Sequence, residues 1–381
     1  MARTLVLGGG FGGLAAAHEL RRRLPAEDEV TLVAASETFY VGFAKLWDLA
    51  GVRPLVEGTR PLANLERHGI TYLHAEVTGI DPAAYAVQTS RGALSGDGMV
   101  IALGADCQPR HLALLGAHAH NLYDASALPA IHADLAALAE GRMLVSILGT
   151  PYLCPPAPFE AALLVHEQLR RRGLSDRVEV VVTTPQPLTL PVAGPDASRF
   201  LADHLAERGI TVLTEHAVES VDHQAGTTRF DNGVSLGWEL MLGVPAAAPP
   251  PVLANSAVAG PSGWVQSDRH SFATSAERVY AVGDCTMIPT ASAQLPKAGV
   301  FAEAEGAIAA ANLAADLHGG DRASFDGHGF CFLELPGRQV AMVTGNFYAE
   351  PRPNVRLTPA DEASFTAKQQ WEQERLAAWL G

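Results

Sequence analysis

Lysine is nearly absent from this chain of 381 residues, in which almost all of the basic residues are arginines. Lysine occurs only at positions 45, 297 and 368, so a lysine that falls inside a motif carries weight. Basic residues are also fewer than acidic ones, and the formal net charge of −14 argues against a nucleic-acid partner and against general attraction to anionic lipid. No run of about 18 apolar residues occurs, so no membrane-spanning helix is expected.

Cysteine is scarce as well, and the four residues Cys107, Cys154, Cys285 and Cys331 are too few for a disulfide scaffold. A selected pair of them remains a candidate for redox chemistry. No histidine, cysteine or aspartate cluster has the spacing of a metal site, so no metal is expected. A leader peptide is not expected in this sequence either, because "MARTLVLGGG" goes directly into a predicted strand and turn. We therefore expect a cytoplasmic protein with at most peripheral membrane contact, or a periplasmic one if a leader has been removed.

What the chain does contain is an internal repeat. Residues 2–36 and 141–185 both predict the order strand, turn, helix, strand, and each helix ends in three consecutive arginines. Cations at a helix C-terminus offset the negative end of the helix dipole, so we do not interpret these arginines as phosphate sites. The repeat predicts two domains of the dinucleotide-binding βαβ type.

The first turn, "VLGGGFGGL", fits the pattern G-x-G-x-x-G with Gly8, Gly10 and Gly13. It follows a predicted strand and opens a predicted helix, which is the context in which such a turn holds a pyrophosphate. The acidic residue that would bind ribose hydroxyls at the end of the second strand is missing. Ser36 or Glu37 is expected to serve instead.

Two later motifs favour a flavin over other nucleotides. "VYAVGDC" ends a predicted strand on Asp284, whose carboxylate is placed to accept a ribityl hydroxyl. "LPKAGVFAEAEG" places Lys297 just before a predicted helix, where the lysine and the helix N-terminus would stabilise negative charge on a reduced flavin. The sequence therefore predicts bound FAD.

The second turn, "GTPYLCPPAPFE", differs from a phosphate-binding turn. Pro151 removes a backbone N–H donor, and Cys154 stands where the third glycine would fall. Tight binding of NADH is therefore not expected at this turn. Because helix N-termini lower the pKa of thiols, we expect Cys154 to favour the thiolate.

Taken in order, the glycine turn, "CPPAPFE", "YAVGD", "LPKAGVFAEAEG" and a late "GFCFLEL" make the chain resemble the sulfide:quinone oxidoreductases. The chain resembles even more their close relative, the flavoprotein subunit of flavocytochrome c sulfide dehydrogenase. The resemblance covers nearly the whole chain, and "CPPAPFE" and "PKAG" are its specific motifs.

The resemblance implies an α/β fold with two Rossmann-like dinucleotide-binding domains, as in disulfide reductases, and a small C-terminal α+β domain. We expect residues 1–107 and 246–322 to form the FAD-binding domain. Residues 108–245 are expected to form the second Rossmann-like domain, a degenerate NAD-type unit, and residues 323–381 the C-terminal domain.

The resemblance also implies the chemistry. Cys154 and Cys331 match the redox cysteine pair, and Glu160 matches a carboxylate that accepts a proton near the sulfide. FAD is expected to be non-covalent, because Gly42 stands near the place where the flavocytochrome subunit has a cysteine. Sulfide would be oxidised to persulfide, polysulfide or sulfur, and electrons would pass to a quinone or a c-type cytochrome.

Two other functions stay open. A type II NAD(P)H dehydrogenase shares the fold but should retain the glycines of the second turn. A non-catalytic flavoprotein serving as a redox sensor should lose Cys154 or Cys331, and this chain has both. Cys107 and Cys285 are expected to be small packing thiols. Which cysteine of the pair takes the sulfide stays open at this point.

Overall fold

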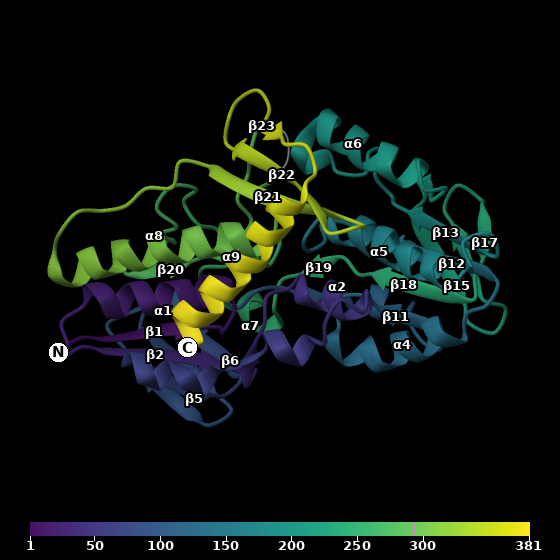
Figure 1. Cartoon of the computed structure of the whole chain (residues 1–381). Helices are drawn as coiled ribbons and strands as arrows, with labels where there is room; N and C mark the ends of the chain where they lie inside the picture. Colours follow the sequence, from purple (N-terminus) through teal and green to yellow (C-terminus); the bar gives the residue numbers. More distant parts are fainter. Residues whose placement is uncertain (292–293) are drawn as a thin grey trace.

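Two parallel sheets, one for each copy of the repeat, form the frame of the molecule (Figure 1). The computed structural model describes residues 1–291 and 294–381. The first sheet contains β1 (Arg3–Leu7), β2 (Glu29–Ala34), β5 (Thr71–His74), β9 (Gly98–Ile101) and β20 (Val279–Ala281), in the order β20-β9-β1-β2-β5. The second contains β11 (Ala119–Asn121), β12 (Gly141–Ile147), β13 (Val178–Thr183), β14 (Thr211–Leu213) and β18 (Leu240–Val244), in the order β11-β18-β12-β13-β14.

The strands of the first sheet come from two separate parts of the chain. The chain leaves after β9, completes the second sheet, and returns with β20, which pairs in parallel with β9. Each parallel sheet is accompanied by a three-stranded antiparallel sheet. These are β6 (Val77–Asp81), β7 (Ala86–Thr89) and β8 (Gly92–Ser95) in the first half, and β15 (Val218–Asp222), β16 (Thr227–Phe230) and β17 (Ser235–Gly237) in the second. The repeat therefore extends beyond the strand–turn–helix unit.

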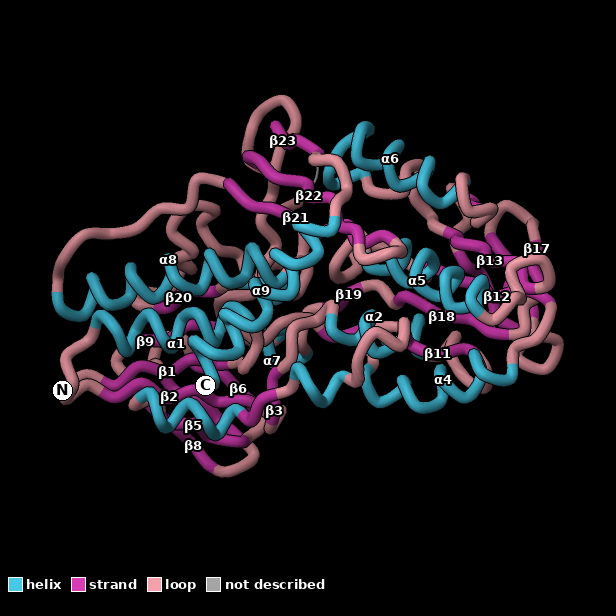
Figure 2. Tube along the Cα trace, viewed as in Figure 1, coloured by secondary structure: helices cyan, strands magenta, loops and turns pink. Residues whose placement is uncertain are grey.

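The first sheet is covered by α1 (Phe11–Arg23) and α8 (Gly299–His318), which lie side by side in Figure 2. Two glycines allow this close contact, since a Cβ on Gly306 would lie only 2.2 Å from the carbonyl oxygen of Gly12. Strand β1 is buried from Thr4 to Leu7, as expected for a parallel strand covered on both faces. The glycine turn between β1 and α1 therefore lies in a closely packed part of the structure.

The remaining elements connect these layers. The helices are α2 (Ala44–Leu49), α3 (Pro109–Leu112), α4 (Leu128–Ala137), α5 (Ala157–Arg171), α6 (Gly194–Ala206) and α7 (Pro251–Ala254). Two short antiparallel pairs complete the set: β3 (Thr38–Phe39) with β4 (Arg60–Pro61), and β10 (Asp106–Cys107) with β19 (Ala247–Ala248). The second pair joins the two segments where the chain passes from one parallel sheet to the other and back.

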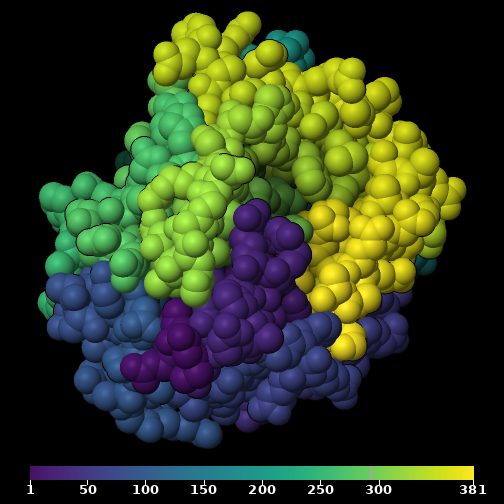
Figure 3. All heavy atoms as spheres, turned by 90° about the vertical axis from the view of Figure 1, so that its left-hand side faces the viewer, coloured from purple at the N-terminus to yellow at the C-terminus, as the bar shows by residue number. Residues whose placement is uncertain are grey.

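The C-terminal segment forms an antiparallel sheet of β21 (His328–Leu335), β22 (Gln339–Asn346) and β23 (Asn354–Leu357), followed by α9 (Glu362–Leu380). The side chain of Asp361 caps α9 by accepting a hydrogen bond from the Ser364 N–H at 2.7 Å. In Figure 3, α1 lies between α8 and the yellow C-terminal segment. Helix α9 contacts both β22 and α1, so it connects the C-terminal sheet to a helix that covers the first parallel sheet.

None of the described helices combines the length and the hydrophobicity needed to span a lipid bilayer.

Candidate active site

The three motif glycines of the first turn have three different environments. A Cβ on Gly8, which has φ +115°, would lie 2.1 Å from the Ala102 carbonyl oxygen, and a Cβ on Gly13 would lie 1.9 Å from the Gly8 carbonyl oxygen. At Gly8 and Gly13 the neighbouring backbone therefore leaves no room for a side chain. A Cβ on Gly10 would meet nothing within 4 Å, and Gly10 lines a large cavity. The backbone at Gly10 is therefore open to a ligand, as a pyrophosphate cradle requires.

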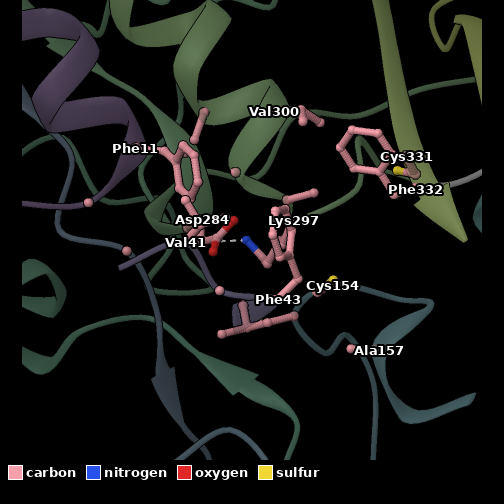
Figure 4. Close-up of a pocket in the computed structure, with 18 of the residues that line it drawn as sticks. Phe11, Val41, Phe43, Cys154, Ala157, Asp284, Lys297, Val300, Cys331 and Phe332 are labelled. Carbon is pink, nitrogen blue, oxygen red and sulfur yellow. Dashed lines mark hydrogen bonds between the residues drawn. The ribbon is translucent and has the colours of Figure 1, made fainter. Parts of the chain in front are cut away.

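That cavity has a volume of about 350 Å³ and lies between the glycine turn, the second turn and the C-terminal sheet. Figure 4 shows Phe11 and Asp284 on one side of it and Cys154, Cys331 and Phe332 on the other. Its lining includes Gly42, Phe43, Lys45, Tyr123, Leu153, Glu160, Lys297, Lys368 and Trp371 as well. Most of the predicted site residues are thus brought to one place from distant parts of the chain.

Asp284 faces the cavity from the turn after β20. Gly283, at φ +72°, makes this turn possible, and the Glu305 carboxylate of α8 accepts the Gly283 N–H at 2.6 Å. Burial raises the pKa of Glu305 to about 7. Burial also raises the pKa of Asp284, although the Lys297 ammonium partly opposes this. The Asp284 carboxylate has no hydrogen-bond partner among the described residues, so it is free to accept a ribityl hydroxyl.

Lys297 lies at the same end of the cavity, where its ammonium group donates to the carbonyl oxygens of Asp284 at 2.6 Å and Thr286 at 2.8 Å. Nζ also lies 3.8 Å from the ring centroid of Trp264. Burial lowers the pKa of Lys297. The side chain is thus held by carbonyl groups beside the helix N-terminus of α8, a position that suits stabilisation of a nearby negative charge.

Cys154 is fixed on the second turn by its backbone. Its φ of +45° is unusual for a residue with a side chain, and its N–H donates to the Lys297 carbonyl oxygen at 2.9 Å. Such conformations concentrate at functional sites, because the surrounding structure must stabilise them. The hydrogen bond links the second turn directly to the segment that carries Lys297.

The prediction that Cys154 favours the thiolate is wrong for the free thiol. Burial raises the pKa of Cys154 to about 12, with a further contribution from the nearby Glu160 carboxylate. The ammonium groups of Lys368 and Lys45 only partly oppose this. Desolvation exceeds the helix effect here because Cys154 precedes the first residue of α5 by three positions and lies against an apolar wall.

Cys331 reaches the cavity from β21, where it pairs with Val343 of β22. Burial raises the pKa of Cys331 strongly, and Cys154 is the next largest cause of this shift. Cys154 and Cys331 are both free thiols in this structure, and a negative charge on either sulfur disfavours ionisation of the other. Cys285 is buried against the carbonyl groups of Ile101 and Val282, whereas Cys107 is half-buried and contacts Asn121.

Glu160 belongs to a buried ionic network. Lys368 of α9 lies between two carboxylates, with Nζ 2.6 Å from Glu334 Oε2 and 3.7 Å from Glu160 Oε1. Glu160 also accepts the Glu334 backbone N–H at 2.7 Å, and Trp47 Nε1 donates to the Glu334 carboxylate at 2.8 Å. Burial raises the pKa of Glu160, and Lys368 lowers it in part. The network joins α5, β21, α9 and α2 at the cavity wall.

Sequence reasoning missed two residues of this site, Lys45 and Lys368. The scarcity of lysine was the signal that could have found them, because the chain has only three lysines and all three line this cavity. Among the predicted residues, Gly8, Gly13 and Ser36 do not line the cavity. Gly8 and Gly13 belong to the glycine turn, whereas Ser36 is exposed and donates to the Thr38 carbonyl oxygen at 2.7 Å.

Two parallel sheets, an open glycine turn and a cavity that holds two cysteines define an α/β oxidoreductase of the dinucleotide-binding type. The family model described as "Pyridine nucleotide-disulphide oxidoreductase" matches residues 2–311, and the chain belongs to this family. FAD binding, as predicted, follows from this membership and from the fit of the glycine turn.

Two relatives and one solved structure show which members of this family the chain is similar to. The chain is 27% identical over 338 residues to the sulfide-quinone reductase of Aquifex aeolicus, covering 82% of this chain and 76% of that protein. It is 25% identical over 314 residues to the mitochondrial sulfide:quinone oxidoreductase of Mus musculus, covering 75% of this chain and 66% of the mouse protein. The crystal structure of the Aquifex aeolicus enzyme superimposes with a TM-score of 0.86 at 23% identity, covering 98% of this chain and 90% of that one. The predicted fold class and the predicted resemblance are confirmed.

The glycine environments predict the effect of blocking the cradle. Gly10 has an extended backbone (φ −87°, ψ −166°) that valine adopts readily, so Gly10→Val should fold. Its side chain would occupy the space left for the pyrophosphate, and bound FAD should fall by roughly tenfold or more. The ratio of flavin to protein absorbance measures this loss, and circular dichroism checks the fold. Gly13→Ala is the contrasting variant, because its Cβ would collide with the Gly8 carbonyl and should reduce folding itself. A Gly10→Val protein with full FAD content would contradict the assignment.

Proposed function

We propose that this protein is a flavin-dependent sulfide oxidoreductase that uses Cys154 and Cys331 as its redox pair and passes electrons to a quinone. One observation carries the proposal. The two cysteines are 177 residues apart in the sequence (331 − 154), yet both line the cavity that also contains Gly10 and Asp284. The sulfide-oxidising relatives support the same substrate.

In the proposed reaction the pair starts as a disulfide. Hydrosulfide attacks one sulfur, the Cys154–Cys331 bond breaks, and a persulfide forms on one cysteine while the other leaves as a thiolate. The proton of the hydrosulfide passes to the Glu160 carboxylate, whose raised pKa suits proton uptake. FAD, when bound, would accept two electrons from the thiolate and so serve as the oxidant of the reaction. Negative charge that develops on the Cys154 sulfur is stabilised by the ammonium groups of Lys45 and Lys368.

Three aromatic side chains support a quinone as the acceptor. Phe43, Phe332 and Trp371 line the cavity, with ring centroids 6.0 to 6.2 Å apart. Lys368 Nζ lies 4.5 Å from the centroid of the Phe43 ring. An uncharged ring system can pack against these aromatic side chains, two pairs of which meet edge to face. A c-type cytochrome is the alternative acceptor and would need only an exposed route for electrons.

We also propose that FAD is held without a covalent bond. Gly42 lines the cavity where an attaching cysteine would be needed, and a Cβ there would meet nothing within 4 Å. The sulfur atoms that line the cavity, within the described residues, belong to Cys154 and Cys331.

The nature of the electron donor tests the proposed function. Under anaerobic conditions, sulfide should bleach the flavin of the purified protein, and NADH should do so far more slowly, because Pro151 removes a donor from the second turn. Stopped-flow absorbance follows both reactions. Fast bleaching by NADH would favour a type II NADH dehydrogenase. Bleaching by neither donor would favour a non-catalytic redox sensor.

A further inference from the structure

The three lysines at the cavity differ in how much of their hydrogen-bonding capacity is used. Lys297 donates to two carbonyl groups, and Lys368 lies between two carboxylates. Lys45, on α2, donates to one acceptor only, the Tyr123 carbonyl oxygen at 2.5 Å. No carboxylate of the described residues lies within ion-pair distance of its ammonium group. An ammonium group has three N–H donors, so Lys45 keeps donors for a ligand.

The surroundings of Lys45 hold the ammonium group beside the second turn. Nζ lies 5.7 Å from the ring centroid of Tyr123 and 6.0 Å from that of Tyr40, so two aromatic rings flank it. The Tyr123 hydroxyl donates in turn to the carbonyl oxygen of Leu153, the residue before Cys154. Lys45, Tyr123, Leu153 and Cys154 all line the cavity. Lys45 is therefore connected to the Cys154 backbone through a single side chain.

The Lys45 ammonium group would offset the negative charge of the carboxylates around the cavity. The network of Glu160, Glu334 and Lys368 contains two carboxylates and one ammonium group. Asp284 and Lys297 add one carboxylate and one ammonium group at the far end of the cavity, so one carboxylate is in excess before Lys45 is counted. An incoming anion would be repelled by this surplus of negative charge. Burial lowers the pKa of Lys45, whereas its interaction with the Cys154 sulfur raises it, so the ammonium form is favoured when an anionic sulfur is near.

We propose that the ammonium group of Lys45 forms an anion subsite that holds hydrosulfide beside Cys154 before the sulfur–sulfur bond forms. This inference rests on the proposed function, which supplies the anion. Lys45 is then a specificity-determining residue that selects a small anionic sulfur nucleophile. The competing explanation is that Lys45 only ties α2 to the segment around Tyr123.

The experiment compares Lys45→Met with Lys45→Arg in the FAD-loaded protein and uses azide, a small monoanion, as the probe. Binding is read from the change that azide causes in the flavin absorption spectrum. Lys45→Met should weaken azide binding by roughly tenfold or more, the scale of a charge-assisted hydrogen bond, and Lys45→Arg should retain most of it. Arg67→Met is the matched control, because it removes an exposed positive charge outside the cavity and should change nothing.

Sulfide gives the second measurement. In single-turnover flavin reduction, Lys45→Met should raise the sulfide concentration for half-maximal rate by roughly tenfold, while the limiting rate changes by only a few fold. A purely structural tie would instead lower FAD content or thermal stability and would leave azide affinity unaffected in the folded fraction. Unchanged azide binding in Lys45→Met would overturn the subsite, and Lys45→Gln repeats the test if the methionine variant does not fold. Lys45-dependent azide binding in a parent protein that sulfide fails to bleach would support the anion subsite and refute the proposed function alone.

Discussion

Replacement of Cys331 by serine is expected to abolish sulfide-driven reduction of the flavin while FAD stays bound. Serine cannot form the disulfide that hydrosulfide attacks, so no electrophilic sulfur remains. The rate should fall on the order of a thousandfold or more, as when a covalent participant is removed from an enzyme. FAD should be retained, because Cys331 comes from β21 and not from the glycine turn that holds the nucleotide. Stopped-flow absorbance gives the rate, and the flavin-to-protein ratio gives the FAD content.

Matched cysteine variants make this test specific. Cys154→Ser should behave like Cys331→Ser, since either change destroys the pair. Cys285→Ser and Cys107→Ser should stay within a few fold of the parent rate, because neither residue lines the cavity. A Cys331→Ser protein that bleached with sulfide at the parent rate would remove the disulfide mechanism altogether.

Lys368→Met is expected to cause the largest loss of stability among the changes considered. Lys368 is 1% exposed, and its removal leaves the carboxylates of Glu160 and Glu334 buried beside each other without a cation. Loss of one partner from a buried ion pair costs about 3–5 kcal/mol in the free energy of unfolding. Urea unfolding of the FAD-loaded protein, followed by circular dichroism, measures the change.

The pH dependence of this loss has a definite sign. The pKa of Glu160 is already raised by burial, and Lys368 is the group that lowers it in part, so the variant should have a still higher pKa. A carboxyl group whose pKa is higher in the folded than in the unfolded protein stabilises the fold below its unfolded pKa, and that contribution is lost as the pH rises through the folded value. The deficit of Lys368→Met should therefore be larger at about pH 8 than at about pH 5.

A second substitution separates charge from packing. Glu334→Gln in the Lys368→Met background removes one of the two unpaired carboxylates while its amide oxygen can still accept from Trp47 Nε1. The double variant should recover a substantial part of the stability. If it is no more stable than Lys368→Met, the loss comes from the packing of the lysine stem and not from uncompensated charge.

Local sequence by itself determined the glycine turn and the two parallel sheets of this protein. Gly13 is required by the Gly8 carbonyl within the same turn, and Gly10 is left open for a ligand. The close approach at Gly8 comes instead from the Ala102 carbonyl, far along the chain. The strand, turn and helix order of the two repeats likewise depends on short-range patterns, and both parallel sheets follow from it. The domain boundaries at residues 107, 245 and 322 stay predictions, as do the roles given to Cys154, Cys331 and Glu160.

Tertiary structure alone decided the electrostatics of the cavity. Lys45, Lys297 and Lys368 come from α2, from the segment before α8 and from α9, and no local pattern indicates that they meet. The raised pKa of Cys154 has the same origin, because desolvation depends on which distant segments cover a group and not on its neighbours in the sequence. The contact predicted between Ser36 and the ribose stays a prediction, since Ser36 is exposed and lies outside the lining of this cavity. Hydrophobic periodicity and turn chemistry act over a few residues, whereas charge and burial are set by packing between segments that are hundreds of residues apart.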